Sequence, residues 1–192
     1  MLLAVKELHS YGIIHNDIKA QNFLVRKGLK YLVLTDYGLS QQMGNVNFGD
    51  GISGTRGYID INYCLSRVRS GYSYRSFSEG VSGDIFSLGM TIYKGFFQNL
   101  ILASLVKDIN YLAMPKKNTA RASIRFIESR VREYGLSHIT LIKKLKNKKQ
   151  VDLKEFYKLI LMMIHPKSSM RPSLNECIDK INDIINSISS IK

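Results

Sequence analysis

Cysteine, histidine and long apolar runs are all scarce in this sequence of 192 residues. The two cysteines, Cys64 and Cys177, form no C-x-x-C pair, which argues against a disulfide framework or a zinc ribbon. The four histidines show no paired metal-ligand spacing. The longest apolar runs, at 99–106 and 159–164, are too short to span a bilayer. The first residues do not form a signal peptide, so we expect a soluble, intracellular protein without a membrane span.

Acidic residues are also few, because 15 Asp and Glu stand against 28 Lys and Arg, giving a formal net charge of +13. A hydrophobic content of 45% and a charged content of 22% exclude a disordered chain. The densest basic stretch, 143–149, holds five lysines in seven residues. A solvated helix end or loop is the expected structure there, and recruitment of an acidic partner, anionic lipid or nucleic acid is the minority alternative. No base-reading motif accompanies the lysines, so nucleic acid is not an expected partner.

Apolar periodicity predicts a mainly helical fold with one small β-hairpin. Residues 2–10 form an amphipathic pattern, and two β-like runs at 23–25 and 29–34 are separated by a short turn containing glycine. The stretch 38–83 predicts an irregular segment with at most one short helix. Gly135 and the prolines are expected to separate helices. The predicted helices cover 84–97, 99–112, 122–134, 136–145, 152–164 and 173–188.

Polar side chains cluster in two loops that flank the predicted hairpin. The loop His-Asn-Asp-Ile-Lys-Ala-Gln-Asn at 15–22 precedes the first β run, and Asp-Tyr-Gly at 36–38 follows the second. Because the hairpin joins them, four side chains are expected near one point. These are Asp17, Lys19, Asn22 and Asp36. Carboxylate and amide oxygens suit Mg²⁺, an ammonium offsets phosphoryl charge, and a second carboxylate can deprotonate a hydroxyl. The set predicts phosphoryl transfer from a magnesium nucleotide.

The two loops resemble the catalytic loop H-R-D-L-K-x-x-N and the D-F-G motif of eukaryotic protein kinases. Three more motifs follow in family order. Residues 54–58 resemble G-T-x-x-Y, residues 84–89 resemble D-x-W-S-x-G, and residues 165–172 resemble H-P-x-x-R-P. Lys19 together with Thr55 matches the serine/threonine pattern.

The subgroup is indicated by three shorter features. Asn-Phe-Leu at 22–24, the tyrosine of Asp-Tyr-Gly at 36–38 and Tyr-Ile-Asp-Ile-Asn at 58–62 resemble the casein kinase one and vaccinia-related kinase group. In that group S-I-N or S-I-D takes the place of the A-P-E motif.

The resemblance implies transfer of the γ-phosphoryl group of ATP to a hydroxyl of a protein substrate, with ATP and Mg²⁺ as cofactors. By the same resemblance Asp17 is the base and orients the acceptor, Lys19 stabilises charge, and Asn22 and Asp36 bind Mg²⁺. The remaining site positions are Gly38, Thr55 and Tyr58 in the activation segment, and His15, Asp84 and Arg171 as structural anchors. Residues 15–22 would be the catalytic loop, 36–62 the activation segment and 84–188 a helical subdomain.

Departures from the family pattern lead to three further expectations. Asn16 replaces the arginine that pairs with a phosphorylated activation segment, so regulation by phosphorylation of 39–57 is not expected. Asn62 replaces the A-P-E glutamate, so Arg171 is expected to lose its ion pair, with local repacking. Tyr37 is expected to be a core aromatic side chain in place of phenylalanine.

The N-lobe motifs of the family are not found before residue 15. Neither a V-A-I-K-like lysine strand nor a helix with its glutamate partner can be placed there, and the G-x-G-x-x-G at 49–54 lies too late in the order. We therefore expect residues 1–192 to be the C-terminal lobe of the protein-kinase-like α+β fold, with the N-lobe absent and weak or no activity alone. A separate N-lobe or docking protein would be a partner. The alternatives are a pseudokinase-like interaction module and, further off, a small-molecule phosphotransferase of the aminoglycoside or choline kinase type.

Overall fold

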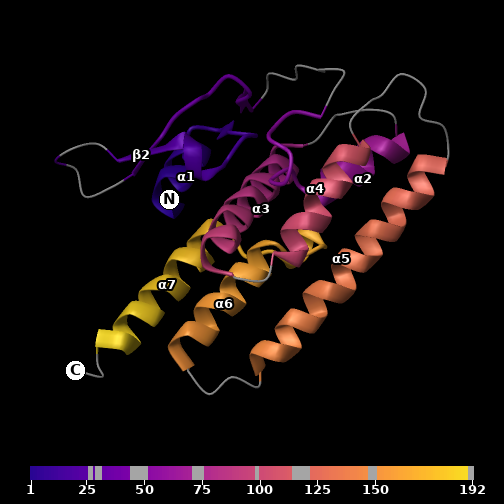
Figure 1. Ribbon diagram of the computed structural model, residues 1–192. Coiled ribbons are helices and arrows are strands. Elements are labelled where there is room, and N and C mark those ends of the chain that lie inside the picture. Colours follow the sequence, from indigo (N-terminus) through magenta and orange to yellow (C-terminus); the bar gives the residue numbers. More distant parts are fainter. Residues whose placement is uncertain are drawn as a thin grey trace.

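The computed structural model describes most of the chain, and Figure 1 shows its arrangement. The described residues are 1–25, 28, 32–43, 52–70, 76–97, 100–113, 122–146 and 151–189. The helices are α1 (Leu2–Ser10), α2 (Ile61–Ser70), α3 (Phe77–Phe96), α4 (Ile101–Ala113), α5 (Ala122–Lys146), α6 (Val151–Met163) and α7 (Leu174–Ser189). Two 3₁₀ turns, η1 (Ala20–Asn22) and η2 (Ser168–Met170), accompany them. The predicted mainly helical fold is confirmed.

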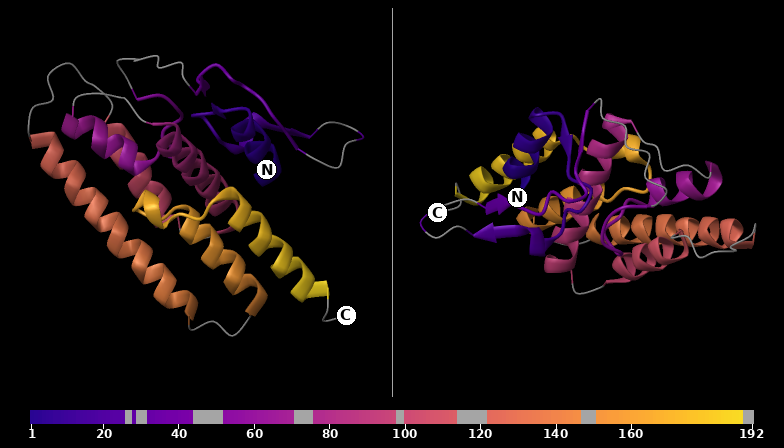
Figure 2. Two further views of the ribbon diagram at one scale, coloured as in Figure 1. Left: turned by 180° about the vertical axis from the view of Figure 1, so that it is seen from behind. Right: turned by 90° about the horizontal axis from the view of Figure 1, so that it is seen from above.

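Two small antiparallel pairs of strands lie at the N-terminal end of the helical body (Figures 1 and 2). The hairpin pairs β2 (Phe23–Val25) with β3 (Leu32–Leu34), in the register Phe23 opposite Leu34. The other pair joins β1 (Ile13–Ile14) to β4 (Gln41–Gln42). The predicted hairpin is confirmed, although its turn residues 26–27 lie outside the described residues. The strands hold the loops 15–22 and 35–40 on the same side of the hairpin.

Helix α3 is the central element, and its side chains enter two hydrophobic clusters. Phe86 and Met90 pack in the cluster formed with α2, α4, α5 and α6, whereas Leu88 packs with α1, β2, β3 and α7. All three of these side chains are fully buried. Gly89 permits the close crossing of α6, because an added Cβ would lie 2.7 Å from Ile164 Cγ2. This rigid helix therefore supports both the strand end and the helical end of the molecule.

Two helices differ from the predictions. Helix α2 is the one short helix expected within the stretch 38–83, but α3 begins at Phe77 rather than residue 84, capped by Ser76 and Glu79 in a reciprocal capping box. Helix α5 runs unbroken through Gly135. Tyr134 and His138, on either side of that glycine, donate hydrogen bonds to carbonyls of α6 and the residue after it (2.7 Å each). These tertiary contacts outweigh the cost of about 1 kcal/mol for one helical glycine.

Two predicted features fall partly on undescribed positions. The G-x-G-x-x-G stretch has residues 49–51 outside the described residues, as are 147–149 of the lysine run. Within the ranges that are described, no helix combines the length and the apolar character that a bilayer crossing needs.

Candidate active site

The loop 15–22 is fastened to α3 by one buried carboxylate. Asp84 accepts hydrogen bonds from the backbone N–H groups of His15 (2.7 Å) and Asn16 (2.9 Å). The ring of His9, from α1, donates to the same carboxylate (2.9 Å). Asp84 is only 1% exposed, so its charge is balanced entirely by donors of the protein. The start of the loop is thereby fixed to the central helix.

The same loop is joined to the segment after β3. The His15 ring donates from Nε2 to the carbonyl of Thr35 (3.0 Å), and its Nδ1 accepts from the N–H of Asp17 (3.2 Å). Asn16 has a positive φ of 67°, a conformation that asparagine tolerates, and its side chain donates to the carbonyl of Leu39 (2.8 Å). The loops on either side of the hairpin therefore form one connected unit.

Asp17, Lys19 and Thr55 form a closed hydrogen-bonded triangle. Lys19 Nζ donates to Asp17 Oδ2 (2.6 Å) and to Thr55 Oγ1 (2.9 Å), and the Thr55 N–H donates to Asp17 Oδ1 (2.7 Å). Burial opposes ionisation of Asp17, but these hydrogen bonds and the Lys19 charge outweigh it and lower the Asp17 pKa below its ordinary value. At neutral pH the site thus presents a carboxylate beside an ammonium.

Asn22 lies beside this triangle, and Asp36 directly follows Thr35, which bonds to Asn22. Asn22 is 5% exposed, and its Nδ2 donates to the carbonyl of Asp17 (2.8 Å), which fixes the orientation of its amide. Thr35 donates from both its N–H (2.9 Å) and its hydroxyl (3.1 Å) to the Asn22 carbonyl. Asp36, the next residue, has a positive φ of 66° and an exposed side chain. The carboxylate of Asp36 accepts no hydrogen bond from any residue whose position is described.

These oxygens suit a Mg²⁺ ion that arrives with a nucleotide. Mg²⁺ prefers hard oxygen ligands, and it commonly takes one or two from the protein and others from phosphate and water. Among the described residues, no group of three or more His, Cys, Asp and Glu side chains could hold a metal. Asn22 Oδ1 and the Asp36 carboxylate are protein oxygen ligands of the kind that such an ion takes beside phosphate and water.

The segment that carries Thr55 is pinned to α3 and α4. Gly54 has φ 117°, and a Cβ there would lie 2.7 Å from the carbonyl oxygen of Asn16, so only glycine fits this approach. Ser87 Oγ donates to the carbonyl of Tyr58 (2.8 Å). Asn110 accepts from the N–H of Gly57 (2.7 Å) and is fully buried. Sequence reasoning missed Asn110, whose signal is a polar residue on the apolar face of α4.

Comparison with known proteins gives the family. Residues 1–181 match the family model described as the protein kinase domain. The chain belongs to the protein kinase domain family. It resembles serine/threonine-protein kinase nekl-2 of Caenorhabditis elegans, with 31% identity over 94 residues, 49% of this chain and 24% of that protein. Serine/threonine-protein kinase D of Synechocystis is 35% identical over 99 residues, covering 48% of this chain and 17% of that protein.

A shorter match reaches higher identity. The cell division cycle 7-related protein kinase of mouse is 44% identical over 41 residues, which cover 21% of this chain and 7% of that protein. The chain therefore spans at most about a quarter of the length of these relatives.

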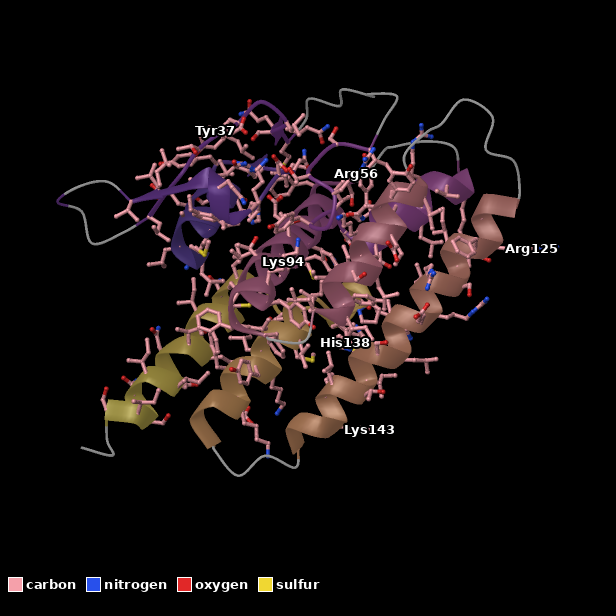
Figure 3. All side chains as sticks on the ribbon, viewed as in Figure 1. Tyr37, Arg56, Lys94, Arg125, His138 and Lys143 are labelled. Atoms are coloured by element: carbon pink, nitrogen blue, oxygen red, sulfur yellow. The ribbon has the colours of Figure 1, made fainter. Side chains whose placement is uncertain are left out.

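Tyr37 of this kinase chain is not the core side chain that was expected. It is 51% exposed and borders an open hollow of about 1010 Å³ between α1 and the β2–β3 hairpin (Figure 3). Its hydroxyl donates to the carbonyl of Leu34 (2.9 Å), and its ring lies 5.4 Å from that of His15. The hydroxyl, which phenylalanine lacks, fixes the ring against the end of β3, and part of the ring remains exposed.

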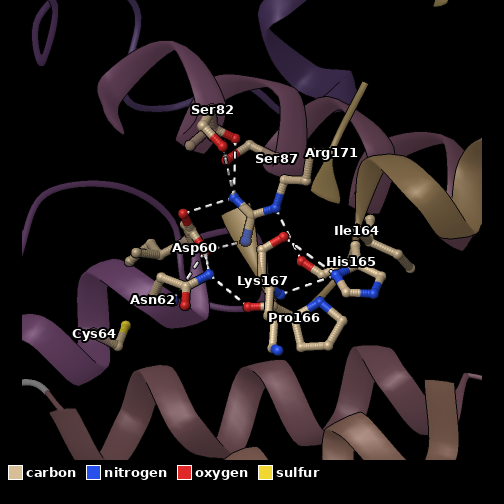
Figure 4. Close-up of polar contacts among 12 residues, drawn as sticks. Asp60, Asn62, Cys64, Ser82, Ser87, Ile164, His165, Pro166, Lys167 and Arg171 are labelled. Carbon is tan, nitrogen blue, oxygen red and sulfur yellow. Dashed lines mark hydrogen bonds and ion pairs between the residues drawn. The ribbon is translucent and has the colours of Figure 1, made fainter. Parts of the chain in front are cut away.

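Arg171 of the kinase chain keeps a carboxylate partner, contrary to expectation. Asp60 supplies it, two residues before Asn62, through Nη1–Oδ2 (2.8 Å) and Nη2–Oδ1 (2.7 Å) contacts (Figure 4). Arg171 also donates to the carbonyls of His165 (2.9 Å) and Ser82 (3.0 Å). Asn62 instead donates to the carbonyl of Pro166 (2.7 Å). The repacking that was expected to offset a lost ion pair is therefore unnecessary.

The predicted site residues thus fall into two groups. One group surrounds the triangle, and the other fastens the far end of the activation segment. The first group contains Asp17, Lys19, Asn22, Thr55, His15 and Asp84, with Asp36 and Gly38 joined through Thr35. Arg171 belongs to the second group with Asp60, and Tyr58 lies between the two. Asp60 was missed because a carboxylate before a helix usually signals only a helix cap.

Proposed function

We propose that this chain is the catalytic part of a serine/threonine protein kinase, which transfers the γ-phosphoryl group of ATP to a hydroxyl of a protein substrate. One observation carries the proposal. The triangle of Asp17, Lys19 and Thr55 lies beside the oxygens of Asn22 and the segment of Asp36. The site thus combines a carboxylate that can accept a hydrogen bond from a substrate hydroxyl, a cation, and oxygen ligands for a metal ion. These are the groups that phosphoryl transfer requires.

Asp17 would accept the hydrogen bond of the substrate hydroxyl and hold its oxygen in line with the phosphoryl group. Because its pKa is lowered, Asp17 is a weak base. It therefore orients the substrate hydroxyl before the reaction. It receives the hydroxyl proton only late in the reaction, when the new bond to phosphorus has withdrawn electrons from the acceptor oxygen and made that proton more acidic. When bound, ATP and Mg²⁺ supply the phosphoryl group and neutralise its charge.

Lys19 would keep Asp17 and Thr55 in fixed positions relative to each other. Its ammonium contacts Asp17 and Thr55 and carries a third N–H that can reach a phosphoryl oxygen. Asn22 and Asp36 would hold Mg²⁺. Gly38 and Tyr58 would shape the activation segment, and His15, Asp84 and Arg171 would keep its two ends fixed.

The apolar hollow is evidence that a further domain or protein packs on this side of the chain. It is lined by side chains of α1 and the hairpin, with Tyr11 at 68% and Val25 at 76% exposure. Large exposed apolar patches usually mark an interface. We propose that residues 1–192 form the C-terminal lobe, with 15–22 as catalytic loop, 36–62 as activation segment and 84–188 as helical subdomain, and that an ATP-binding lobe covers the hollow. The casein kinase one and vaccinia-related group remains the proposed subgroup.

The cysteines bear on the cellular compartment. Cys64 and Cys177 are both buried and are not joined in a disulfide, as in proteins kept under reducing conditions. They support an intracellular location.

The alternative function is an interaction module that docks partners through the hollow without catalysis. The hollow favours it. The intact triangle favours the enzyme, as does the exposed Asp36 carboxylate, which accepts no hydrogen bond from the residues that the structure describes. The two functions make opposite predictions for Asp17→Ala. That change would abolish transfer by a kinase and would leave partner binding at the hollow intact.

The test is transfer of radiolabelled phosphate from ATP to a serine- and threonine-rich protein. We expect weak or no transfer by the 192-residue chain alone and Mg²⁺-dependent transfer once a kinase N-lobe is supplied by fusion. Asp17→Ala should lower the rate by roughly 10²–10⁴-fold. Robust transfer by the chain alone would refute the single-lobe proposal. Transfer to choline or an aminoglycoside, with none to protein, would refute protein kinase function.

A further inference from the structure

Most of the positive charge of this chain lies in and around helix α5. The stretch 114–150, which contains the helix, holds 11 Lys and Arg and only 2 Asp and Glu, so it contributes +9 of the net charge of +13. Both acidic residues lie on α5 and are already paired, Glu128 with Arg69 (2.7 Å) and Glu133 with Arg130 (2.7 Å). No further acidic residue of the stretch is left to offset its other cations.

One face of α5 is buried and the opposite face is exposed. Ile127, Tyr134 and His138 are fully buried, and the Tyr134 and His138 side chains bond to α6 and the residue after it. The outer face of α5, on the other side of the helix, consists of exposed residues: Arg125, Arg132, Leu136, Ile139 and Lys143. The helix runs along one side of the helical body, with Arg125 and Lys143 near its two ends (Figures 1 and 3). Among the described residues, no element covers this face.

The residues of the outer face form one line along the helix. Arg132, Leu136 and Lys143 follow Arg125 by 7, 11 and 18 residues, which are close to whole numbers of helical turns. At about 1.5 Å per residue, the line from Arg125 to Lys143 is about 27 Å long. Cations stand at both ends, and Leu136 (68% exposed) and Ile139 (50% exposed) lie between them. The line therefore combines positive charge with exposed apolar side chains.

The protein itself does not neutralise the cations of the outer face. In the part of the chain that the structure describes, none of Arg125, Arg132 and Lys143 forms an ion pair. A ligand for this face must therefore be anionic, and it must also remove Leu136 and Ile139 from water to gain their burial energy.

An anionic bilayer meets both requirements. Its phosphate headgroups attract Lys and Arg, and the boundary between headgroups and acyl chains accepts Leu and Ile side chains from a helix that lies in the plane of the surface. A nucleic acid offers phosphates, but single strands also bind by stacking on aromatic side chains, and the outer face of α5 contains none. The composition of this face therefore favours a lipid surface.

We propose that the outer face of α5 binds the surface of a bilayer that contains anionic phospholipids. Arg125, Arg132 and Lys143 contact headgroup phosphates, and Leu136 and Ile139 enter the boundary between headgroups and acyl chains. The helix lies along the surface and does not cross the bilayer. The proposal goes beyond phosphoryl transfer, because it assigns a place of action to the kinase chain rather than a reaction.

The experiment measures sedimentation of the full 192-residue chain with vesicles. One set of vesicles contains phosphatidylcholine alone, and the other contains equal parts of phosphatidylcholine and phosphatidylserine. We expect the chain to sediment with the mixed vesicles only, and to bind them more weakly at about 1 M than at about 0.1 M salt, because the Debye length falls from about 10 to about 3 Å. Equal binding to both kinds of vesicle, or none to either, would overturn the proposal.

A triple variant tests the three cations. Each Lys or Arg near an anionic leaflet contributes about fivefold in binding, so Arg125→Gln, Arg132→Gln and Lys143→Gln together should weaken binding to mixed vesicles by roughly 100-fold. The control removes the same charge from exposed lysines elsewhere: Lys6→Gln, Lys167→Gln and Lys180→Gln. The control should bind nearly as well as the unchanged chain. Equal losses in the two triple variants would show that net charge alone acts, and would overturn the assignment to α5.

A double variant tests the apolar side chains. Leu136→Ser with Ile139→Ser should weaken binding to mixed vesicles by about tenfold, since two partly buried aliphatic side chains are lost. The matched control is Ile185→Ser with Ile188→Ser on α7, which are 53% and 49% exposed, and it should bind like the unchanged chain. All of these changes affect exposed side chains, and circular dichroism checks that each variant folds. Unchanged binding by the Leu136 and Ile139 variant would contradict insertion of this face.

Two further measurements separate this proposal from its neighbours. Binding of a fluorescent DNA duplex that is lost in the triple variant on α5, without sedimentation on mixed vesicles, would identify a nucleic-acid site and overturn the lipid proposal. Asp17→Asn should abolish phosphate transfer and leave vesicle binding unchanged. Vesicle binding by a chain that transfers no phosphate even when fused to an N-lobe would count against the kinase function and still support the lipid surface.

Discussion

Replacement of Asp60 by asparagine tests how the activation segment is fastened to the rest of the kinase chain. The Asp60 and Arg171 side chains are 5% and 1% exposed, and they are joined by two contacts of 2.7 and 2.8 Å. Asp60→Asn keeps the shape of the side chain and removes its charge. The Arg171 guanidinium then stays buried with two carbonyls of His165 and Ser82, and no carboxylate.

The expected cost follows from that burial. Removing one partner of a buried ion pair typically costs about 3–5 kcal/mol, because the remaining charge is left uncompensated. The carbonyl contacts that Arg171 retains place Asp60→Asn near the lower limit, about 3 kcal/mol. By contrast, Asn62→Ala removes a hydrogen bond to Pro166 (2.7 Å) and a longer one to Asp60 (3.4 Å), and it should cost about 1 kcal/mol. Combining Asp60→Asn with Arg171→Met should recover part of the loss, since no unpaired charge remains.

The assay is urea unfolding of the full chain, followed by circular dichroism and analysed by linear extrapolation. The single Asp60 variant, the single Asn62 variant and the double variant are compared at one pH and one salt concentration. If Asp60→Asn and Asn62→Ala cost the same, about 1 kcal/mol, Asp60 is not the partner of a buried Arg171 and the reasoning is refuted. An additive double variant would refute it as well.

Three further predictions concern the site and its surroundings. Gly54→Ala should destabilise the fold by about 2 kcal/mol in urea, from the positive φ and the contact with Asn16, whereas Gly95→Ala, in open space on α3, should not destabilise. An NMR titration of ¹³C-dimethylated lysines should give Lys94 a pKa of about 8, and the Lys94 pKa should rise in the Lys107→Gln variant. A Lys94 pKa near 10.5 in the unchanged chain would contradict the burial of this side chain. Because folding lowers the Asp17 pKa, ionised Asp17 stabilises the fold above its ordinary pKa of 3.8, and this stabilisation is lost as the pH falls below it. The urea stability of Asp17→Asn should therefore fall less between pH 5 and 3 than that of the unchanged chain, and parallel curves would contradict the shift.

Local patterns in the sequence were sufficient for the hairpin, for most helices and for the residues of the loop 15–22. Strand alternation, helical periodicity and short motifs are properties of neighbouring residues, so they can be read without knowledge of tertiary contacts. The Asp60–Arg171 pair is different, because its partners lie 111 residues apart. Which of positions 60 and 62 meets Arg171 depends on where α2 begins, and the family motif points to position 62.

Tertiary packing also decided the other differences. Helix α5 continues through Gly135 because Tyr134 and His138 bond to α6 and the residue after it, and a local pattern contains only the glycine. The exposure of Tyr37 likewise depends on what covers the hollow beside it, which an aromatic residue in a motif does not reveal. The positions of Lys94 and Lys107 around Gly57 arise only once α3 and α4 lie on either side of the turn.

The central claim is that Asp17 directs phosphate transfer from the triangle it forms with Lys19 and Thr55. The most direct test is the initial rate of radiolabelled phosphate transfer to a protein substrate by the chain fused to a kinase N-lobe. We expect Asp17→Asn to lower this rate by roughly 10²-fold or more, while Asp179→Asn, an exposed change on α7, leaves it unchanged. Equal rates for the Asp17 variant and the unchanged chain would show that Asp17 has no such role.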